Sequence, residues 1–423
     1  MTRLTRTTQE IHGSVADGFD AVREEFATFV AQESAQRPHY EGQLCAYVHG
    51  RRVVDLWAPG NDAHTPDDPT GPTDPFGSTG STGSTDSPGS PGSPDSLYGV
   101  YSSTKGAAHL VVALLVQEGT LELDRKVTYY WPEFAAEGKG ALTLRELLGH
   151  RAGVIGTDGG FSPQELADDR QIAERLADQR PFWRPGTAFG YHALVIGALT
   201  GEVVRRATGR TLQEVYEERV RAPYGLDFFL GLPAVHEPRF RTAQPMAPTA
   251  EQRALLDAQP SGPHTLAAVA FNRHTAEPTD LELLPNDPLI RAKGPASVGG
   301  VASARGLAGL YAAAISEVDG KAPLLKGDTA AEFGQLHSVG YDVVLRTHKS
   351  YGLGFQATAD NWYPFLGAGA FGHSGAGGCQ AFADPRSGLA YGYTRRRYAF
   401  PGGAAPENER LVAAVHRAAL TVG

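Results

Sequence analysis

The chain has 423 residues, of which 41% are hydrophobic and 20% charged, so it has the composition of a globular protein and not of a disordered chain. At about 150 residues per domain, this length predicts two or three lobes. The 38 Lys and Arg residues against 47 Asp and Glu leave a net charge of −9, which is a poor basis for holding phosphate backbones, so we expect no nucleic-acid partner.

The cysteines and the amino-terminal segment indicate the cellular compartment. Cys45 and Cys379 are too few for a disulfide framework, and they lack the CxxC spacing of a zinc site. Residues 1–26 contain no apolar signal-peptide core, and the longest apolar run, 110–116, is too short to cross a bilayer. We therefore expect a cytoplasmic protein with no membrane partner, and with no metal ion.

The first expected elements are a helix and a hairpin. Within residues 15–31, apolar side chains recur at spacings of three and four, which predicts an amphipathic helix. Two short apolar runs follow, 44–48 and 53–57, joined by the turn His49-Gly50-Arg51-Arg52. This pattern predicts a β-hairpin.

Residues 61–96 differ in composition from the rest of the chain. Of these 36 residues, 33 are Gly, Pro, Ser, Thr, Asp or Asn, and GST and SPG repeats run through the segment. Burial of the few apolar side chains in this segment cannot offset the entropy lost on folding. We therefore expect a disordered loop insertion. It would be either slack in a surface loop or a flap over the motif that follows it.

The remaining residues alternate between helical and β-like patterns. Residues 102–117 are apolar on nearly all sides, which predicts a buried helix that ends at Gly119. Arg395, Arg396 and Arg397 follow a late strand, where we expect a solvated strand end or, alternatively, a rim that binds an acid. Further helices are expected over 161–180, 192–207, 211–219 and 406–420, and β-like runs over 352–356, 380–383 and 389–393.

This order of elements indicates the fold class. Strand patterns near both ends of the chain enclose a helical middle, which favours an α+β fold. We expect a three-layer α/β/α sandwich whose antiparallel sheet is built from about 40–58 and 290–400. An inserted, mostly helical lobe would lie beside it.

Ser102 and Lys105 carry the sharpest chemical signal. They lie three residues apart at the expected start of a helix, so their side chains share one face, where the first-turn amides favour developing negative charge. Residues 106–117 contain no Asp, Glu, Lys or Arg, so burial should lower the pKa of the Lys105 amine. A neutral amine beside a hydroxyl is a general base beside a nucleophile. The short SxxK pattern also arises by chance. Its position at the start of an apolar helix is what favours the catalytic interpretation.

Two later segments add to this signal. Residues 185–193, PGTAFGYHA, form a turn that presents Tyr191 ahead of a helix. Residues 372–378, GHSGAGG, are small enough to let the backbone approach a substrate closely. Taken singly, Tyr191 also fits a core tyrosine, and His373 a structural histidine.

Together, the SxxK motif, Tyr191 and the HSG stretch resemble the serine β-lactamase and penicillin-binding-protein superfamily. The chain is most similar to the class-C-like branch, which includes the family VIII carboxylesterases. The segments VVDLW at 53–57, YWPEF at 130–134, LLGHRAG at 147–153 and 371–378 carry the same likeness. It covers nearly the whole chain except 61–96.

The resemblance implies a β-lactamase/transpeptidase-like fold in which 1–423 form one catalytic unit. Residues 1–60 and 290–423 would form the α/β lobe, 107–285 the helical lobe, and the active site would lie between them.

The resemblance also implies roles for individual residues. Ser102 would be the acyl-accepting nucleophile, Lys105 its base, and Tyr191 the group that passes a proton to the leaving group and activates water. The backbone N–H groups of Ser102 and Ala376 would form the oxyanion hole. His150 would be structural. Substrate-binding roles would fall on His373, Ser374, Gly375 and His192.

Departures from the lactamase pattern favour esters. Where those enzymes carry Lys-Thr-Gly, this chain has His373-Ser374-Gly375, so a fixed cation is replaced by a side chain that is mostly neutral at pH 7. Where they carry Tyr-x-Asn, this chain has Tyr191-His192-Ala193, which lacks the amide. We therefore expect a serine hydrolase of the carboxylesterase type, acting on a small ester or acyl substrate without a cofactor.

Other functions are compatible with the same residues. An acyltransferase, a β-lactamase or a D-amino-acid peptidase would use the same acyl-enzyme, and a binding protein would keep the fold without turnover. A near match to GxSxG would instead make Ser374 the nucleophile, with Asp384 and His416, although Ala376 occupies the fifth position. No HExxH or phosphate-loop pattern supports metal or nucleotide chemistry.

Overall fold

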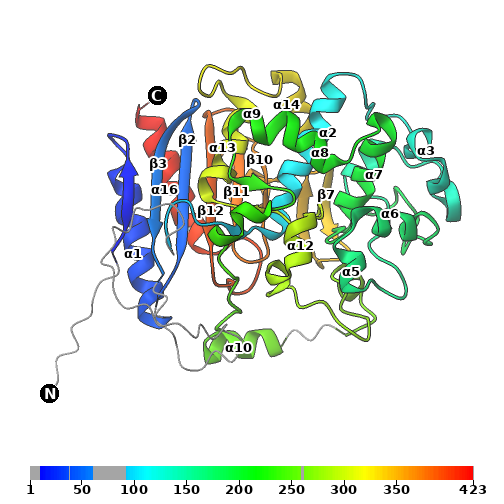
Figure 1. Ribbon diagram of the computed structural model, residues 1–423, viewed down its shortest axis with the longest axis horizontal. Helices are drawn as coiled ribbons and strands as arrows, with labels where there is room; N and C mark the ends of the chain where they lie inside the picture. Colours follow the sequence, from blue (N-terminus) through cyan, green and yellow to red (C-terminus); the bar gives the residue numbers. More distant parts are fainter. Residues whose placement is uncertain (1–9, 38, 61–91, 259–261, 423) are drawn as a thin grey trace.

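The computed structural model describes residues 10–37, 39–60, 92–258 and 262–422. At its centre is a nine-stranded sheet in the order β1-β3-β2-β12-β11-β10-β9-β8-β7, antiparallel throughout (Figure 1). β2 pairs with β12, so segments from the two ends of the chain meet inside the sheet. The predicted α+β class with an antiparallel sheet is confirmed.

The strands of the large sheet are two to eight residues long. They are β1 (His12–Val15), β2 (Gly42–Val48), β3 (Arg51–Ala58), β7 (Ser338–Asp342), β8 (Thr347–Tyr351), β9 (Gln356–Ala357), β10 (Phe371–Ser374), β11 (Gln380–Asp384) and β12 (Leu389–Arg395). β2 and β3 form the predicted hairpin. A small second sheet has the order β4-β6-β5, from β4 (Tyr98–Gly99), β6 (Val301–Ala302) and β5 (Phe228–Phe229).

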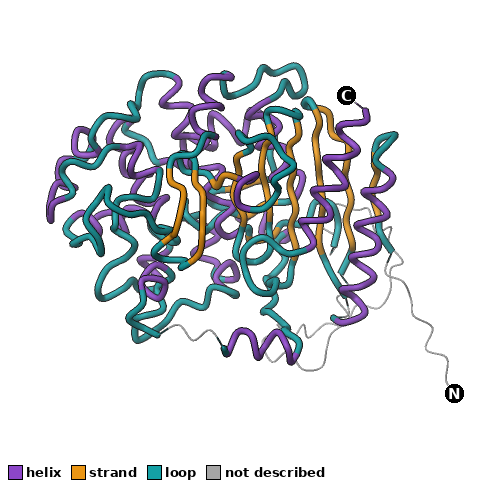
Figure 2. Tube along the Cα trace, turned by 180° about the vertical axis from the view of Figure 1, so that it is seen from behind, coloured by secondary structure: helices purple, strands orange, loops and turns teal. Residues whose placement is uncertain are grey.

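Two helices from the ends of the chain, α1 (Asp20–Gln36) and α16 (Glu407–Val422), cover one face of the large sheet (Figure 2). Successive strand residues point to opposite faces, so Leu44 and Ala46 of β2 pack with these helices. Cys45, between them, packs instead with α13 (Ala304–Ile315) on the other face. α1 begins later than the predicted residue 15, because Val15 pairs with Val54 in the sheet.

The helix that follows the SxxK motif lies on the same side as α13. α2 (Thr104–Gln117) is buried from Thr104 to Leu115, as predicted. The helical part around it comprises η1 (Tyr101–Ser103), α3 (Val127–Tyr130), η2 (Pro132–Gly138), α4 (Leu144–Leu148), α5 (Pro163–Leu166), α6 (Asp169–Ala177), α7 (Ile196–Thr208), α8 (Leu212–Tyr216), η3 (Glu217–Arg221), α9 (Ala222–Tyr224), η4 (Ala234–Arg239), α10 (Ala250–Asp257), α11 (Leu266–Ala270), η5 (Leu284–Asn286) and α12 (Pro288–Lys293). The later helices are α14 (Gly327–Gly334) and α15 (Thr358–Asn361). Among the residues that the structure describes, no helix combines the length and apolar character that a bilayer span requires.

Two predicted elements differ in extent. The helix expected over 161–180 is divided into α5 and α6, because the Asp168 side chain accepts hydrogen bonds from the N–H groups of Arg170 and Gln171 and begins a new helix. The strand expected over 352–356 is wrong: Gly354 has a φ of +76° within a bend, and β8 and β9 lie on either side.

The prediction of a solvated strand end is wrong for Arg395. Its side chain is only 5% exposed, with Nη1 2.7 Å from a Glu407 carboxylate oxygen and Nη2 2.9 Å from one of Glu33. These carboxylates come from α16 and α1, which pack over this end of β12. Arg395 therefore connects α1 and α16 to the sheet through these two ion pairs.

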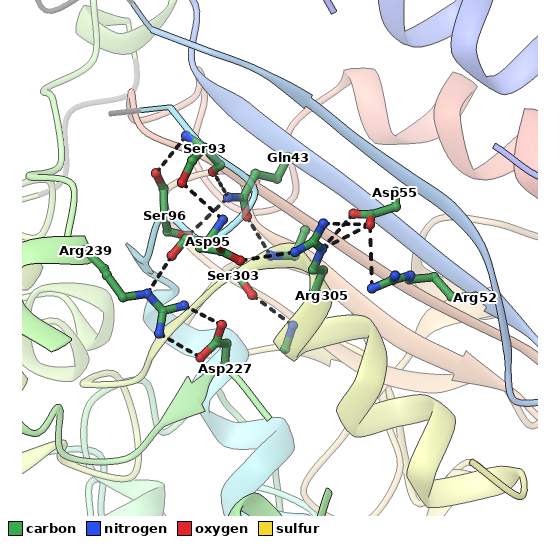
Figure 3. A network of polar contacts seen from close by, with 12 residues as sticks. Gln43, Arg52, Asp55, Ser93, Asp95, Ser96, Asp227, Arg239, Ser303 and Arg305 are labelled. Carbon is green, nitrogen blue, oxygen red and sulfur yellow. Dashed lines mark hydrogen bonds and ion pairs between the residues drawn. The ribbon is translucent and has the colours of Figure 1, made fainter. Parts of the chain in front are cut away.

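A polar network fixes the chain just before the SxxK motif (Figure 3). The Gln43 Nε2 group donates to the carbonyls of Ser93 at 2.9 Å and Ser96 at 3.1 Å. Arg305, from α13, donates to Asp55 at 2.9 Å and to Asp95 at 3.1 Å. Ser93 and Ser96 are 1% and 2% exposed, so the predicted disorder is wrong for this end of 61–96. Residues 61–91 lie outside the described residues.

Candidate active site

Ser102 lies in η1, on a tight turn immediately before α2. The preceding residue, Tyr101, has a φ of +48°, a left-handed conformation that costs free energy in a residue other than glycine. Its hydroxyl donates to the Glu282 carbonyl at 2.6 Å, and its ring packs edge-on against Tyr398 at 5.7 Å. This packing holds the strained turn in place. The turn exposes Ser102 to a pocket, whereas Tyr101 and Ser103 on either side of it are buried.

Lys105, one helical turn further on, is fully buried. Its Nζ lies 3.1 Å from Ser102 Oγ and donates to the carbonyls of Ala193 at 2.7 Å and Ser297 at 2.8 Å. Within the described ranges, no carboxylate forms an ion pair with it. Desolvation therefore holds the pKa of Lys105 well below its ordinary value.

Tyr191 completes a cluster with these two side chains. Lys105 Nζ lies 5.0 Å from the centroid of the Tyr191 ring, and Ser102 is among the groups that influence the pKa of the Tyr191 hydroxyl. Burial raises the pKa of Tyr191 above its usual value, so the phenol keeps its proton at neutral pH. The structure thus brings together Ser102, Lys105 and Tyr191, as their predicted roles require.

A carboxylate that the sequence analysis missed fixes the backbone of Tyr191. Asp342, at the end of β7, is buried and accepts the Tyr191 N–H at 3.2 Å. Its other oxygen accepts the Tyr351 hydroxyl at 2.9 Å, and the Tyr351 ring lies parallel to that of Tyr191 at 6.3 Å. The N–H groups of Val344 and Leu345 also donate to Asp342, both at 2.9 Å. Asp342 is therefore a positioning residue for Tyr191.

The turn between β10 and β11 forms the facing wall. Ser374 donates from both N–H and Oγ to Gln356 Oε1, at 2.8 and 3.1 Å. A Cβ on Gly375 would overlap the Val100 carbonyl oxygen, so a glycine is needed for this turn to approach the SxxK turn. Ala376 lines the pocket beside Ser102, and over the described residues neither of their N–H groups donates a hydrogen bond. Both are free to donate to an oxyanion.

His192 and His373, for which substrate contacts are predicted, do not place their rings on the wall of this pocket. His373 is 1% exposed, and its ring stacks on Tyr191 at 5.9 Å. His192 is fully buried, with Nδ1 2.7 Å from the Gly190 carbonyl oxygen. Gly375 also lies off the wall, so of the predicted substrate-binding residues only Ser374 lines it.

Buried histidines surround the cluster and are uncharged at neutral pH. Burial lowers the pKa of His109 to about 3 and that of His192 to about 4. It also holds the pKa values of His150 and His373 well below the ordinary value. Across the described residues, His, Cys, Asp and Glu side chains form no group of three or more that could hold a metal ion.

The pocket in front of Ser102 has a volume of about 620 Å³. Its only charged lining side chain in the described part of the chain is Lys349, which the sequence analysis missed. Lys349 Nζ lies 5.0 Å from the ring centroid of Trp362, another lining residue. Uncharged residues form the rest of the wall: Ser102, Tyr191, Phe271, Leu281, Leu345, Thr347, Gln356, Trp362, Ser374, Ala376, Tyr398, Pro401, Gly402, Gly403 and Ala404.

The alternative triad of Ser374, Asp384 and His416 is not assembled. Ser374 faces Gln380 across the β10–β11 pair, whereas Asp384 lies at the other end of β11 and accepts from Ser387 Oγ at 2.7 Å. His416 packs against Phe365 at 5.3 Å. No helix follows Ser374 directly, so the elbow of a GxSxG nucleophile is also missing.

Comparison with known proteins agrees with this geometry. The model of the Beta-lactamase family matches residues 26–414, and the chain belongs to that family. It is 30% identical over 308 residues to Esterase/beta-lactamase LipL of Mycobacterium tuberculosis (strain ATCC 25618 / H37Rv), covering 71% of this chain and 70% of that protein.

Solved structures give the same assignment. EstA from Arthrobacter nitroguajacolicus Rue61a superposes with a TM-score of 0.81 at 37% identity, covering 97% of this chain and 98% of that one. A family VIII carboxylesterase superposes with a TM-score of 0.78 at 30% identity, covering 97% and 100%. The protein is therefore an enzyme of the esterase/β-lactamase family with carboxylesterase neighbours, and the predicted resemblance is confirmed.

Proposed function

We propose that the protein is a serine carboxylesterase that forms an acyl-enzyme on Ser102, with Lys105 as general base and Tyr191 as proton relay. The observation that carries this proposal is the hydrogen-bonding environment of Lys105 Nζ. Two carbonyl oxygens and one hydroxyl surround it, at 2.7, 2.8 and 3.1 Å.

A neutral amine has two N–H donors and one lone pair, and these three partners match them. The carbonyls of Ala193 and Ser297 take the two N–H donors, because a carbonyl oxygen can only accept. The lone pair is then left for the hydroxyl proton of Ser102. Since no carboxylate in the described part of the chain stabilises the ammonium form, the amine can accept that proton.

The reaction follows from these positions. Ser102 Oγ attacks the ester carbonyl carbon as its proton passes to Lys105, and the N–H groups of Ser102 and Ala376 donate to the resulting oxyanion. The bond to the leaving oxygen then breaks, and the proton moves from Lys105 through the Tyr191 hydroxyl to that oxygen. Deacylation runs the same route in reverse, with water in place of the alcohol.

An ester substrate fits the pocket better than an amide. Most of the lining is apolar or aromatic, including Phe271, Leu281, Trp362 and Tyr398, which suits small acyl or aryl groups. The position two after Tyr191 is Ala193, which offers no side-chain amide to hold a substrate amide.

The test is covalent labelling of Ser102. A fluorophosphonate should label the wild-type protein and Ser374→Ala but not Ser102→Ala, and 4-nitrophenyl butyrate should give a burst of nitrophenol only from the first two. Label retained by Ser102→Ala would overturn the proposal. Added 1-butanol separates hydrolysis from acyl transfer: butyl ester as the main product would assign an acyltransferase instead.

A further inference from the structure

Lys349 is the charged side chain of the active-site pocket. It lies on β8, where alternate residues share a face, so Thr347 and Lys349 line the pocket together. The Lys349 side chain donates no hydrogen bond to, and forms no ion pair with, any residue that the structure describes. No Asp or Glu in the described part of the chain lines the pocket, so the charge of Lys349 is available to attract an anionic ligand there.

The carboxylate that interacts electrostatically with Lys349 is already hydrogen-bonded to other groups. Asp342 influences Lys349 electrostatically, but its oxygens already accept four hydrogen bonds, from the N–H groups of Tyr191, Val344 and Leu345 and from the Tyr351 hydroxyl. Asp342 is also buried, whereas Lys349 is half-buried on the pocket wall. The lysine is held over Trp362 by a cation–π contact and not by an acid.

A second donor lies on the same wall. Gln356 Oε1 accepts both donors of Ser374, which fixes the amide orientation. Its Nε2 group donates to no other described residue, so both of its hydrogens are available at the pocket. An ammonium and an amide N–H₂ together suit a carboxylate, which accepts through two oxygens.

We propose that this wall is an anion subsite and that the preferred substrates are esters carrying a free carboxylate, such as half-esters of dicarboxylic acids. This inference rests on the proposed esterase function. The sequence comparison of His373 with the lactamase lysine indicated a pocket without a fixed cation, and Lys349 supplies one from a different strand. A pocket lined by one sign of charge raises the local concentration of an oppositely charged substrate.

The experiment compares monoethyl adipate with ethyl hexanoate, and 4-acetoxybenzoate with 4-methylphenyl acetate. In each pair the ester is retained and a methyl group is replaced by a carboxylate, on the acyl side in the first pair and on the leaving-group side in the second. The readout is the ratio of kcat/KM for the anionic and neutral ester within one variant, so any general loss of activity cancels.

Lys349→Met should lower this ratio roughly 10- to 100-fold for at least one pair, through KM, as expected for a lost charge-assisted contact. Lys349→Arg should keep most of the preference. Lys326→Met removes the same charge from an exposed site outside the pocket and should leave the ratio unchanged. Equal ratios in Lys349→Met and wild type for both pairs would overturn the anion subsite while leaving the esterase intact.

A binding measurement separates the two proposals. Calorimetry of monoethyl adipate and ethyl hexanoate with Ser102→Ala needs no turnover. Monoethyl adipate should bind more tightly than the neutral ethyl hexanoate, and adding Lys349→Met should abolish the difference. If the wild-type enzyme hydrolyses no ester but this difference is present, the esterase fails and the anion subsite stands; equal binding of the two esters overturns the subsite.

Discussion

At the scale of single residues, the proposed mechanism makes the reactivity of Ser102 depend on the protonation state of Lys105. Burial without a carboxylate lowers the pKa of Lys105, so the amine is uncharged over a range of pH in which an exposed lysine is charged. Activity should be complete above this lowered pKa and should be lost as the pH falls through it. The acid limb of kcat/KM for a neutral ester should therefore lie well below pH 10.5.

Replacing Lys105 tests the same point. Lys105→Met should reduce kcat/KM by about 10²–10⁴-fold, because the hydroxyl proton then has no base. Lys139 offers a matched control, since it is also buried and donates to two carbonyls, those of Ala136 and Gln179, both at 2.8 Å. Lys139→Met should lower the melting temperature but keep the kcat/KM of the folded protein. Near-wild-type activity of Lys105→Met would contradict the assigned base.

The sequence was sufficient for some of these residues and not for others. Ser102 and Lys105 could be found because a three-residue spacing and an apolar helix are local patterns. Asp342 and Lys349 could not, because only strand pairing brings β7 and β8 next to Tyr191. His192 lies outside the pocket wall because adjacency to Tyr191 in the chain does not put both side chains on the same surface.

At the scale of elements, α7 supports the base through a close backbone contact. A Cβ on Gly197 would overlap the backbone of Ala296 and Ser297, and the Gly197 N–H donates to Ser297 Oγ at 2.8 Å. The Ser297 carbonyl is one of the two acceptors of Lys105. The distance between α7 and the backbone at Ala296 and Ser297 therefore determines where the Lys105 amine lies.

Gly197→Ala should push the segment away and lower kcat/KM by roughly 10²-fold, the cost of about 1 Å of misplacement. Gly201, one turn along the same helix, has open space around its Cβ position, with Leu212 Cβ nearest at 3.8 Å. Gly201→Ala should keep full activity and raise the free energy of unfolding by about 0.5–1 kcal/mol. Equal kcat/KM for the two variants would show that this contact does not position Lys105.

Element prediction succeeded where a pattern was long and continuous. The apolar run of α2 and the paired runs of β2 and β3 lie where the sequence predicts. Short strands such as β8 and β9 were missed, because their extended conformation depends on neighbours far away in the chain. Arg395 was misjudged for the same reason, since its partners belong to α1 and α16.

At the scale of the whole molecule, the buried histidines make stability depend on pH. Their folded pKa values are lowered, to about 3 for His109 and about 4 for His192, and those of His150 and His373 are also well below 6.5. Below pH 6.5 the unfolded chain therefore binds protons that the folded chain does not. Stability is full above this pH and falls as the pH drops towards 4.

Each histidine should contribute a slope of up to about 1.4 kcal/mol per pH unit in this window. Asp169, whose pKa is raised to about 6, and Asp342, whose pKa is also raised by burial, act in the opposite direction but are two groups against four. Urea unfolding between pH 7.5 and 4.5 measures the slope. His109→Phe should reduce the slope by the contribution of one histidine, because neither ring nitrogen of His109 has a hydrogen-bond partner among the described residues. A flat profile across this window would contradict the assignment.

The strand order also has a consequence for biosynthesis. Ser102, Lys105 and Tyr191 are all translated in the first half of the chain, whereas β10, β11 and β12 come near its end and lie between β9 and β2. Until those three strands leave the ribosome, β2 is paired on one side only and Ser102 lacks its facing wall. The nascent polypeptide thus carries its candidate reactive groups long before the sheet and the pocket around them are complete.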